Sequence, residues 1–376
     1  MGGLEPGVGR TAQGIDRDRE DNQMSTDTKP KKRSLLERLA DGSVICAEGY
    51  LFEIERRGYL EAGAYVPEVV LENPEVVSQL HREFRRAGSD VMEAFTYYGH
   101  REKLRLIGKE DLLEPLQRNA LALAKAAAEE GAGEPALVAG NICNTNVYQP
   151  DDPAAEAKVR EMFDEQIGWA AEAGVDFVIA ETIRYFGEAK LALEAIKRVN
   201  LPAAVMLVVD NDEILRDKVG LVDVCIRLEQ AGADVVGLNC SRGPDTMLPL
   251  IEQIRSAVSC YVAALPVPYR TTSEQPTFQS LCDPHCDCIP DNRPFPIALD
   301  PFTCNRYEIG AFTRKAHALD VRYLGLCCGT APHHVRAMAE ALGRQPEASR
   351  YSADNVQALG IRHRVEPQVG EPRVRR

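Results

Sequence analysis

A short module recurs along this chain and limits the folds that the chain can adopt. A helical stretch runs into Ala-Gly-x-Asp and then into a hydrophobic run rich in β-branched residues, at 87–91, 173–177 and 231–235, with a degenerate copy at 318–321. The glycine suits the left-handed residue that ends a helix, so a strand can start at once. Repeated helix, turn and buried strand predict parallel β-strands joined by helical crossovers.

The number of candidate strands predicts a (β/α)8 TIM barrel, an α/β fold. Helical patterns such as 68–86 and 114–130 separate the strands. Eight such units over roughly 310 residues fit this barrel, whose typical size is about 250 residues and more with insertions. A doubly wound open sheet is the alternative, but no Gly-x-Gly-x-x-Gly follows the first strand. The expected strands cover 44–48, 89–96, 136–142, 176–181, 203–209, 234–239, 260–267 and 322–327.

The barrel domain is predicted at 35–343, between a disordered N-terminal segment (1–34) and a short polar C-terminal tail (344–376), because both ends lack apolar periodicity. The net charge of −13 argues against a general affinity for nucleic acid or anionic membranes. No apolar run approaches the length of about 20 residues that a membrane span needs. Eleven cysteines without an export signal predict reduced thiols in the cytoplasm.

Two adjacent cysteines, Cys327 and Cys328, are the most informative feature for function. Neighbouring side chains of a regular strand point to opposite faces, so both thiols can share a target only where the chain leaves β structure, as Gly329 permits. Cys240 ends a similar hydrophobic run. Three thiolates just past two strands could hold Zn²⁺ with its fourth position open, which is the catalytic pattern of zinc binding. The alternative is that these cysteines are small buried hydrophobic residues.

Acidic and aromatic residues also gather at the expected carboxyl ends of strands, where TIM barrels carry their chemistry. One acidic residue there is more often a helix cap or a solvated charge, but three at corresponding positions favour a common pocket. Thiolate ligands leave zinc a weak Lewis acid, and a substrate thiol bound to it loses its proton, so the pattern favours alkyl transfer to sulfur over hydrolysis. The residues at these ends are Glu48; Glu93 with Phe95, Tyr97 and Tyr98; Asn141 and Cys143; and Glu181.

Several motifs are shared with a known family. They are Leu-Leu-Glu-Arg-Leu (35–39), Arg-Arg-Gly-Tyr (56–59), Gln-Leu-His-Arg-Glu-Phe-x-x-Ala-Gly-Ser (79–89), Gly-Leu-Asn-Cys (237–240), Pro-Phe-Pro (294–296) and Gly-x-Cys-Cys-Gly (325–329). Through them the chain resembles the homocysteine S-methyltransferase family, most closely its betaine-dependent members, from about residue 35 to residue 342. The paired cysteines together with the distant Asn-Cys form a specific signature.

The resemblance implies a (β/α)8 barrel in which Cys240, Cys327 and Cys328 bind zinc and the sulfur of homocysteine adds the fourth ligand. It implies methyl transfer from a betaine-like onium donor to homocysteine, which yields methionine. Glu181 falls on the carboxylate that holds the homocysteine amino group, which suits a buried ammonium. Aromatic faces suit the onium group through cation–π attraction. The residues implied in catalysis are Glu48, Tyr98 and Glu181, and those implied around the substrates are Glu48, Tyr65, Glu93, Phe95, Tyr97, Tyr98 and Glu181.

This sequence departs from the family pattern near the substrates rather than at the metal. Glu48 replaces an aspartate, Tyr65 falls on a tryptophan of the betaine-specific members, Thr182 replaces a tyrosine, and Glu93 stands where an amide is usual. The donor therefore stays open among betaine, dimethylsulfoniopropionate and S-methylmethionine. The same departures motivate an alternative function, a catalytically altered zinc-binding homologue that acts as a binding or sensing module.

A second cysteine cluster precedes Pro-Phe-Pro and contains Cys282, His285, Cys286 and Cys288. Its spacing matches none of the common structural zinc motifs, so it favours a lid over the barrel mouth, with a second metal as the alternative. The C-terminal extension that helps betaine enzymes oligomerise has no counterpart beyond about residue 350. A homo-oligomer is therefore an open expectation.

Overall fold

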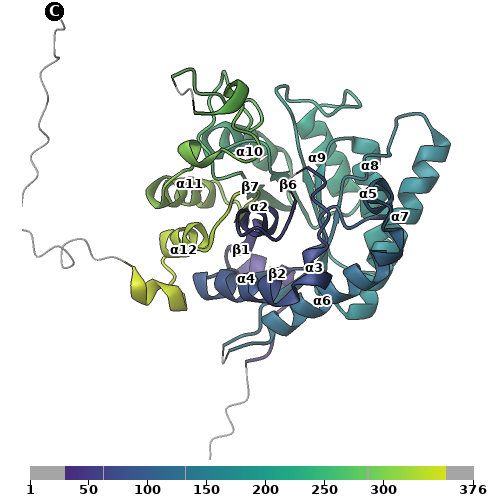
Figure 1. Ribbon diagram of the computed structural model, residues 1–376, viewed down its shortest axis with the longest axis horizontal. Helices are drawn as coiled ribbons and strands as arrows, with labels where there is room; N and C mark the ends of the chain where they lie inside the picture. The colour runs from purple at the N-terminus through teal and green to yellow at the C-terminus, as the bar shows by residue number, and fades with distance from the viewer. Residues whose placement is uncertain (1–29, 62, 132, 286–287, 353–376) are drawn as a thin grey trace, which may run out of the picture.

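Eight parallel strands close into a barrel in sequence order, which confirms the predicted fold class. The computed structural model describes residues 30–61, 63–131, 133–285 and 288–352. Each predicted strand has a counterpart, and helices surround the barrel (Figure 1). The strands are β1 (Val44–Ala47), β2 (Val91–Glu93), β3 (Leu137–Cys143), β4 (Phe177–Ile183), β5 (Ala203–Leu207), β6 (Val235–Asn239), β7 (Tyr261–Leu265) and β8 (Tyr323–Leu326).

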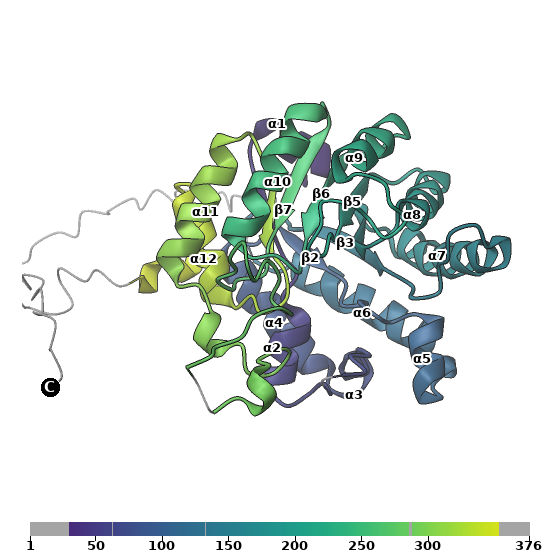
Figure 2. The same cartoon turned by 90° about the horizontal axis from the view of Figure 1, so that it is seen from above.

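Twelve α-helices are present in the described ranges, and three of them lie at the ends of the barrel. Figure 2 shows α1 at the end where the strands begin, and α2 and α3 at the end where they finish. The helices are α1 (Leu35–Asp41), α2 (Tyr50–Arg56), α3 (Val69–Glu72), α4 (Pro74–Ala87), α5 (Arg101–Ile107), α6 (Leu113–Ala128), α7 (Pro153–Ala173), α8 (Phe186–Arg198), α9 (Leu221–Gln230), α10 (Pro244–Ala257), α11 (Arg306–Ala318) and α12 (Pro332–Ala341).

The prediction of one continuous helix over 68–86 is wrong, because this segment forms two helices, α3 and α4. The break lies at Asn73, whose φ of −140° and ψ of 62° are not helical. The ring of Pro74 disfavours helical geometry in the residue before it, and proline at the first helical position then starts α4 without loss of a hydrogen bond. The other predicted helix, 114–130, corresponds closely to α6.

The Ala-Gly-x-Asp modules show why this fold repeats. Their glycines are left-handed, with φ of 109°, 72° and 96° at Gly88, Gly174 and Gly232. The aspartate of each module accepts a backbone N–H from the neighbouring strand and pairs with a basic side chain, which fixes the start of one strand to the start of the next. These contacts are Asp90 with Ile45 N and Arg344, Asp176 with Val138 N and Lys32, and Asp234 with Ala203 N and Lys197.

The segment between β7 and α11 lies over the carboxyl end of the barrel, beside α2 (Figure 2). Phe278 of this segment stacks on Tyr269 at 6.0 Å between ring centroids and contacts Phe52 of α2. At the opposite end, Arg344 reaches Asp90 and the short helix Glu347–Tyr351 packs against α4. Among the described residues, no helix is both long and apolar enough to cross a membrane.

Candidate active site

Three cysteine sulfurs meet at the carboxyl end of the barrel. Cys240 follows the end of β6, and Cys327 and Cys328 follow the end of β8. The sulfur of Cys328 lies 3.8 Å from that of Cys240 and 3.9 Å from that of Cys327, and all three sulfurs lie within 4.8 Å of one another. Tetrahedral zinc with Zn–S bonds of about 2.3 Å separates its sulfur ligands by about 3.8 Å. The donor set and its spacing therefore fit zinc.

The backbone leaves regular strand geometry at both places, as convergence of the thiols requires. Cys240 and Ser241 have φ of 60° and 62°, and Gly329 has φ of 94°. A Cβ on Gly329 would lie 2.2 Å from the hydroxyl of Tyr269, so no other residue fits there without displacement of this buried ring. Strained backbone of this kind persists where the surrounding structure holds it and gathers at functional sites.

The three thiols differ in pKa. Hydrogen bonds from Cys327 and Cys328 lower the pKa of Cys240 well below its usual value, and burial opposes this effect. The contact with Cys240 raises the pKa values of Cys327 and Cys328 well above the usual value. Cys240 is thus the most acidic thiol of the trio. A divalent cation would favour the ionised form of all three thiols, because metal coordination removes the thiol proton.

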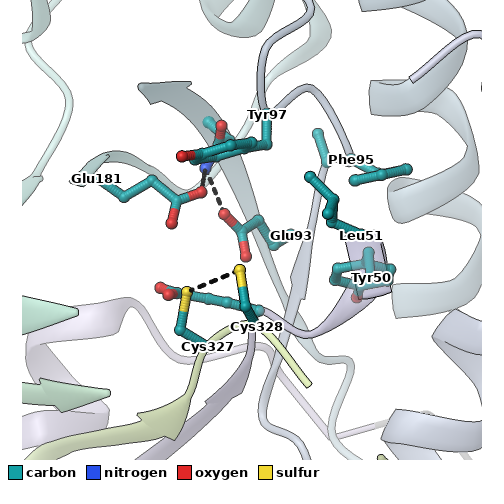
Figure 3. Close-up of a pocket in the computed structure, with 11 residues that line it drawn as sticks. Tyr50, Leu51, Glu93, Phe95, Tyr97, Glu181, Cys327 and Cys328 are labelled. Atoms are coloured by element: carbon teal, nitrogen blue, oxygen red, sulfur yellow. Dashed lines mark hydrogen bonds between the residues drawn. The ribbon is translucent and has the colours of Figure 1, made fainter. Parts of the chain in front are cut away.

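Three buried glutamates lie beside the sulfurs and are connected by two asparagine amides. Asn141 Nδ2 donates to Glu93 and, at 2.6 Å, to Glu181 Oε1. Asn239 Nδ2 donates to Glu181 Oε2 at 2.6 Å and to Glu48 Oε2 at 3.2 Å. Figure 3 shows Glu93 and Glu181 on one side of the cavity, near Tyr97, with the paired cysteines opposite. The amides orient the carboxyl groups towards a common space.

The carboxyl groups are poorly compensated by the protein itself. Burial raises the pKa of Glu181 to about 7, and burial together with repulsion from Glu181 raises the pKa values of Glu48 and Glu93 well above their usual range. Glu48 Oε1 and Glu93 Oε2 are buried without a hydrogen-bond partner among the described residues. A buried carboxylate needs a paired charge or hydrogen bonds, so this cluster is suited to a cationic ligand.

A cavity of about 320 Å³ contains most of the predicted site residues (Figure 3). The residues that line it lie at or just past the ends of β1, β2, β3, β4 and β8 and at the start of α2. The sequence analysis predicted only some of them. Tyr50, Leu51, Ala94 and Asn141 line it in addition to the residues predicted for substrates or metal. Those predicted residues are Glu48, Glu93, Phe95, Tyr97, Glu181, Cys327 and Cys328.

Two predicted aromatic residues lie next to this cavity rather than in its lining. Tyr98 packs on Tyr97 at 4.3 Å between ring centroids, and Lys103 Nζ lies 3.9 Å from the centroid of the Tyr98 ring. Tyr65 stacks on Phe52, and burial together with the charge of Cys328 raises the pKa of Tyr65 to about 12. Tyr65 therefore lies close to the sulfurs, and its buried hydroxyl has no hydrogen-bond partner among the described residues.

The sequence analysis assigned no role to two of the site residues, Asn141 and Asn239. Both had a signal, since each stands at the carboxyl end of a buried strand, and Asn239 precedes Cys240 in a family motif. An amide beside a carboxylate in space is invisible in the sequence, because the two partners come from different strands. Asn239 also accepts the backbone N–H of Thr182 at 2.9 Å, which ties β4 to β6.

Replacing Glu93 with glutamine is expected to stabilise the fold more strongly as pH rises. Because the pKa of Glu93 is raised, the folded chain keeps a proton that the unfolded chain loses above about pH 4.5, so the wild-type free energy of unfolding falls with pH. The loss amounts to about 1.4 kcal/mol per pH unit up to the folded pKa. Glutamine removes this titration.

Urea unfolding at pH 5 and pH 8 measures the effect. The matched control is Glu194→Gln, on the outer part of α8, where Glu194 pairs with Arg160 at the surface. The control should show the same difference from wild type at both pH values. An equal effect of Glu93→Gln at pH 5 and pH 8 would contradict a carboxyl group that is buried without compensation.

The second cysteine cluster is only partly covered by the described residues, because Cys286 lies outside them. Cys282 is a free thiol whose sulfur accepts a hydrogen bond from Gln275 Nε2 at 3.0 Å. In the ranges that the structure describes, neither Cys282 nor Cys288 joins a group of three side chains able to hold a metal. The lid prediction is untested, although the segment does lie at the barrel mouth.

Comparison with known proteins agrees with this geometry. A family model described as homocysteine S-methyltransferase matches residues 45–342. The chain belongs to the homocysteine S-methyltransferase family. This membership confirms the resemblance carried by the sequence motifs and makes the chain a methyltransferase. The match spans the whole barrel, from β1 to the residue after α12.

Family members named for different methyl donors are similarly close to the chain. The betaine–homocysteine S-methyltransferase 1 of Danio rerio is 38% identical over 85% of the chain and 79% of its own length. The S-methylmethionine–homocysteine S-methyltransferase BHMT2 of Pongo abelii is 35% identical over 83% of the chain and 82% of its own length. The metallated form of the Escherichia coli homocysteine methyltransferase MmuM shares the fold, with a TM-score of 0.63 at 19% identity over 81% of the chain and 99% of its own length.

Proposed function

We propose that this protein is a zinc-dependent enzyme that transfers a methyl group from a betaine-like onium donor to the sulfur of homocysteine. The observation that carries the proposal is the trio of sulfurs at tetrahedral spacing next to three buried carboxyl groups, two of which have an oxygen without a hydrogen-bond partner among the described residues. Cys240, Cys327 and Cys328 would hold the zinc ion. Bound zinc supplies one function here, which is to keep the thiol of the substrate in its nucleophilic, deprotonated form at neutral pH.

The carboxyl cluster would orient homocysteine. Glu181 lies between the two asparagine amides and within reach of Cys327, so an ammonium held there keeps the amino acid next to the metal. In the reaction the homocysteine sulfur forms a bond to the donor methyl carbon, and the bond from that carbon to the onium atom breaks. The bonding electron pair returns to the onium atom, and the thiol proton leaves to solvent. Positioning of the two reactants supplies much of the rate.

The aromatic side of the cavity would hold the donor. Tyr97 lines the cavity, with Tyr98 packed on it, and Tyr65 lies near Cys328. Aromatic faces attract a quaternary ammonium or a sulfonium by about 2 kcal/mol or more once water is excluded. A quaternary ammonium donor and a sulfonium donor therefore both remain in the proposal. The relatives named for betaine and for S-methylmethionine also suggest these two classes.

A donor panel tests the proposed function. Zinc-loaded protein is incubated with homocysteine and betaine, dimethylsulfoniopropionate or S-methylmethionine, and methionine is measured by mass spectrometry. We expect methionine from at least one donor, and a loss of at least 100-fold in rate after removal of the metal with a chelator. Full activity of the metal-free protein would overturn the zinc requirement. Tight binding of homocysteine without product from any donor would instead favour a binding or sensing module.

A further inference from the structure

Three arginine side chains converge on one aspartate at the barrel mouth, next to the proposed active site. Asp210, in the loop after β5, forms ion pairs with Arg184 and, at 3.3 Å, with Arg216. Arg242 Nη2 donates to the backbone carbonyls of Asp210 and Asn211 at 2.7 and 3.1 Å. In the described part of the chain, Asp210 is the one carboxylate that forms an ion pair with any of the three. This arginine cluster (Arg184, Arg216 and Arg242) therefore has more guanidinium groups than ion-paired carboxylates.

One member of the arginine cluster has a buried donor without a partner. Arg242 is 8% exposed, and its Nε finds no hydrogen-bond acceptor among the described residues. A buried cationic donor that the protein leaves unsatisfied is costly, so an anion near this loop would stabilise it.

A second cavity opens beside the arginine cluster. It has a volume of about 400 Å³, and Arg184 and Arg216 line it together with Asn144, Asn146 and Tyr148. These side chains offer guanidinium, amide and phenol hydrogen-bond donors. Glu188 also lines the cavity, but its Oε1 already accepts the N–H and the hydroxyl of Thr145 at 2.8 and 2.6 Å. The chemistry of the lining is that of a site for a carboxylate.

The course of β4 brings Arg184 close to the substrates. Arg184 follows Glu181 by three residues, and between them the register of β4 against β5 shifts, with Thr182 at φ of 59°. A bulge of this kind re-aims the side chains that follow it. Burial raises the pKa of Tyr98, and the charge of Arg184 opposes this effect, so Arg184 lies near Tyr98, which packs on Tyr97 in the cavity lining. Arg184 is therefore close to the aromatic side of the proposed active site.

We propose that Arg184 binds the carboxylate of a zwitterionic substrate and acts as a specificity-determining residue of the transfer. Arg184 uses Nη1 for Asp210, so Nε and Nη2 present the paired donors that a carboxylate accepts in bidentate fashion. The carboxylate belongs either to homocysteine, whose ammonium Glu181 would hold, or to the onium donor. The inference rests on the proposed function, and the experiment separates the two sources and the two claims.

Calorimetry with zinc-loaded wild type, Arg184→Gln and Arg184→Lys tests the proposal. The ligands form two pairs, each with and without a carboxylate: homocysteine and 3-mercaptopropylamine, and the best donor of the panel or betaine against tetramethylammonium. Arg184→Gln should raise the Kd of one carboxylated ligand by about 10- to 100-fold and leave its carboxylate-free partner unchanged. Arg184→Lys should lie between, because an ammonium keeps the charge but loses the paired geometry. The affected pair identifies the source.

Equal effects of Arg184→Gln on both members of each pair, or no effect on any ligand, would overturn the role of Arg184. The control Arg198→Gln, which removes a surface arginine at the end of α8, should change no Kd. If wild type forms no methionine from any donor, the proposed function fails, and the ratios of Kd still decide the role of Arg184.

Discussion

Cys240→Ser should lose its zinc and at least 1000-fold of its rate of methionine formation. A serine hydroxyl stays protonated where the Cys240 thiol ionises, and it is a poor ligand for zinc, which binds thiolate and imidazole groups. Two sulfurs would remain, and two ligands do not hold the ion at the spacing seen here. Metal content by elemental analysis and initial rates with homocysteine and the best donor measure both losses.

Cys260→Ser is the matched control for this variant. Cys260 is a partly exposed free thiol at the start of β7, away from the sulfur trio. It should keep its zinc and its rate, and both variants should unfold cooperatively, which separates loss of metal from loss of fold. A Cys240→Ser protein that bound one equivalent of zinc with wild-type activity would remove the foundation of the proposed mechanism.

Glu181→Gln should raise the KM for homocysteine by about 100-fold or more. Loss of one partner of a buried ion pair costs about 3–5 kcal/mol, because the other charge is left without compensation. An amide can still accept hydrogen bonds, but it does not neutralise the ammonium of the substrate. Steady-state kinetics with the donor at saturation measure the change, and Glu194→Gln on α8 serves as a surface control with an unchanged KM.

The pH dependence of the same KM provides a second readout. Burial raises the pKa of Glu181 to about 7, so the free enzyme increasingly carries a neutral Glu181 as pH falls below 7. The wild-type KM for homocysteine should therefore rise by nearly tenfold for each pH unit below this value, whereas the Glu181→Gln variant should lack this component. Identical pH profiles of the two proteins between pH 5.5 and 8.5 would show that Glu181 does not hold the ammonium.

Local sequence patterns were sufficient for the fold because several βα units carry their own signals. The glycine that ends a helix, the aspartate after it and the run of β-branched residues lie within a few positions, and the closed barrel follows from their repetition. Asn73-Pro74 shows the limit of periodicity, since an apolar pattern continues across a break that proline imposes. The predicted position of the cysteines past the strand ends was also correct.

The sequence by itself determined the eight-stranded barrel and the residue types at the ends of its strands, because these depend on short-range order along the chain. Only the tertiary structure decided which of those side chains meet: Asn141 with Glu93 and Glu181, Asn239 with Glu181 and Glu48, and three arginines around Asp210. These groups come from different strands and loops, and their distances follow from the closure of the barrel and from a bulge in β4. Hydrogen bonds and unpaired charges between such distant residues leave no periodic trace in the sequence.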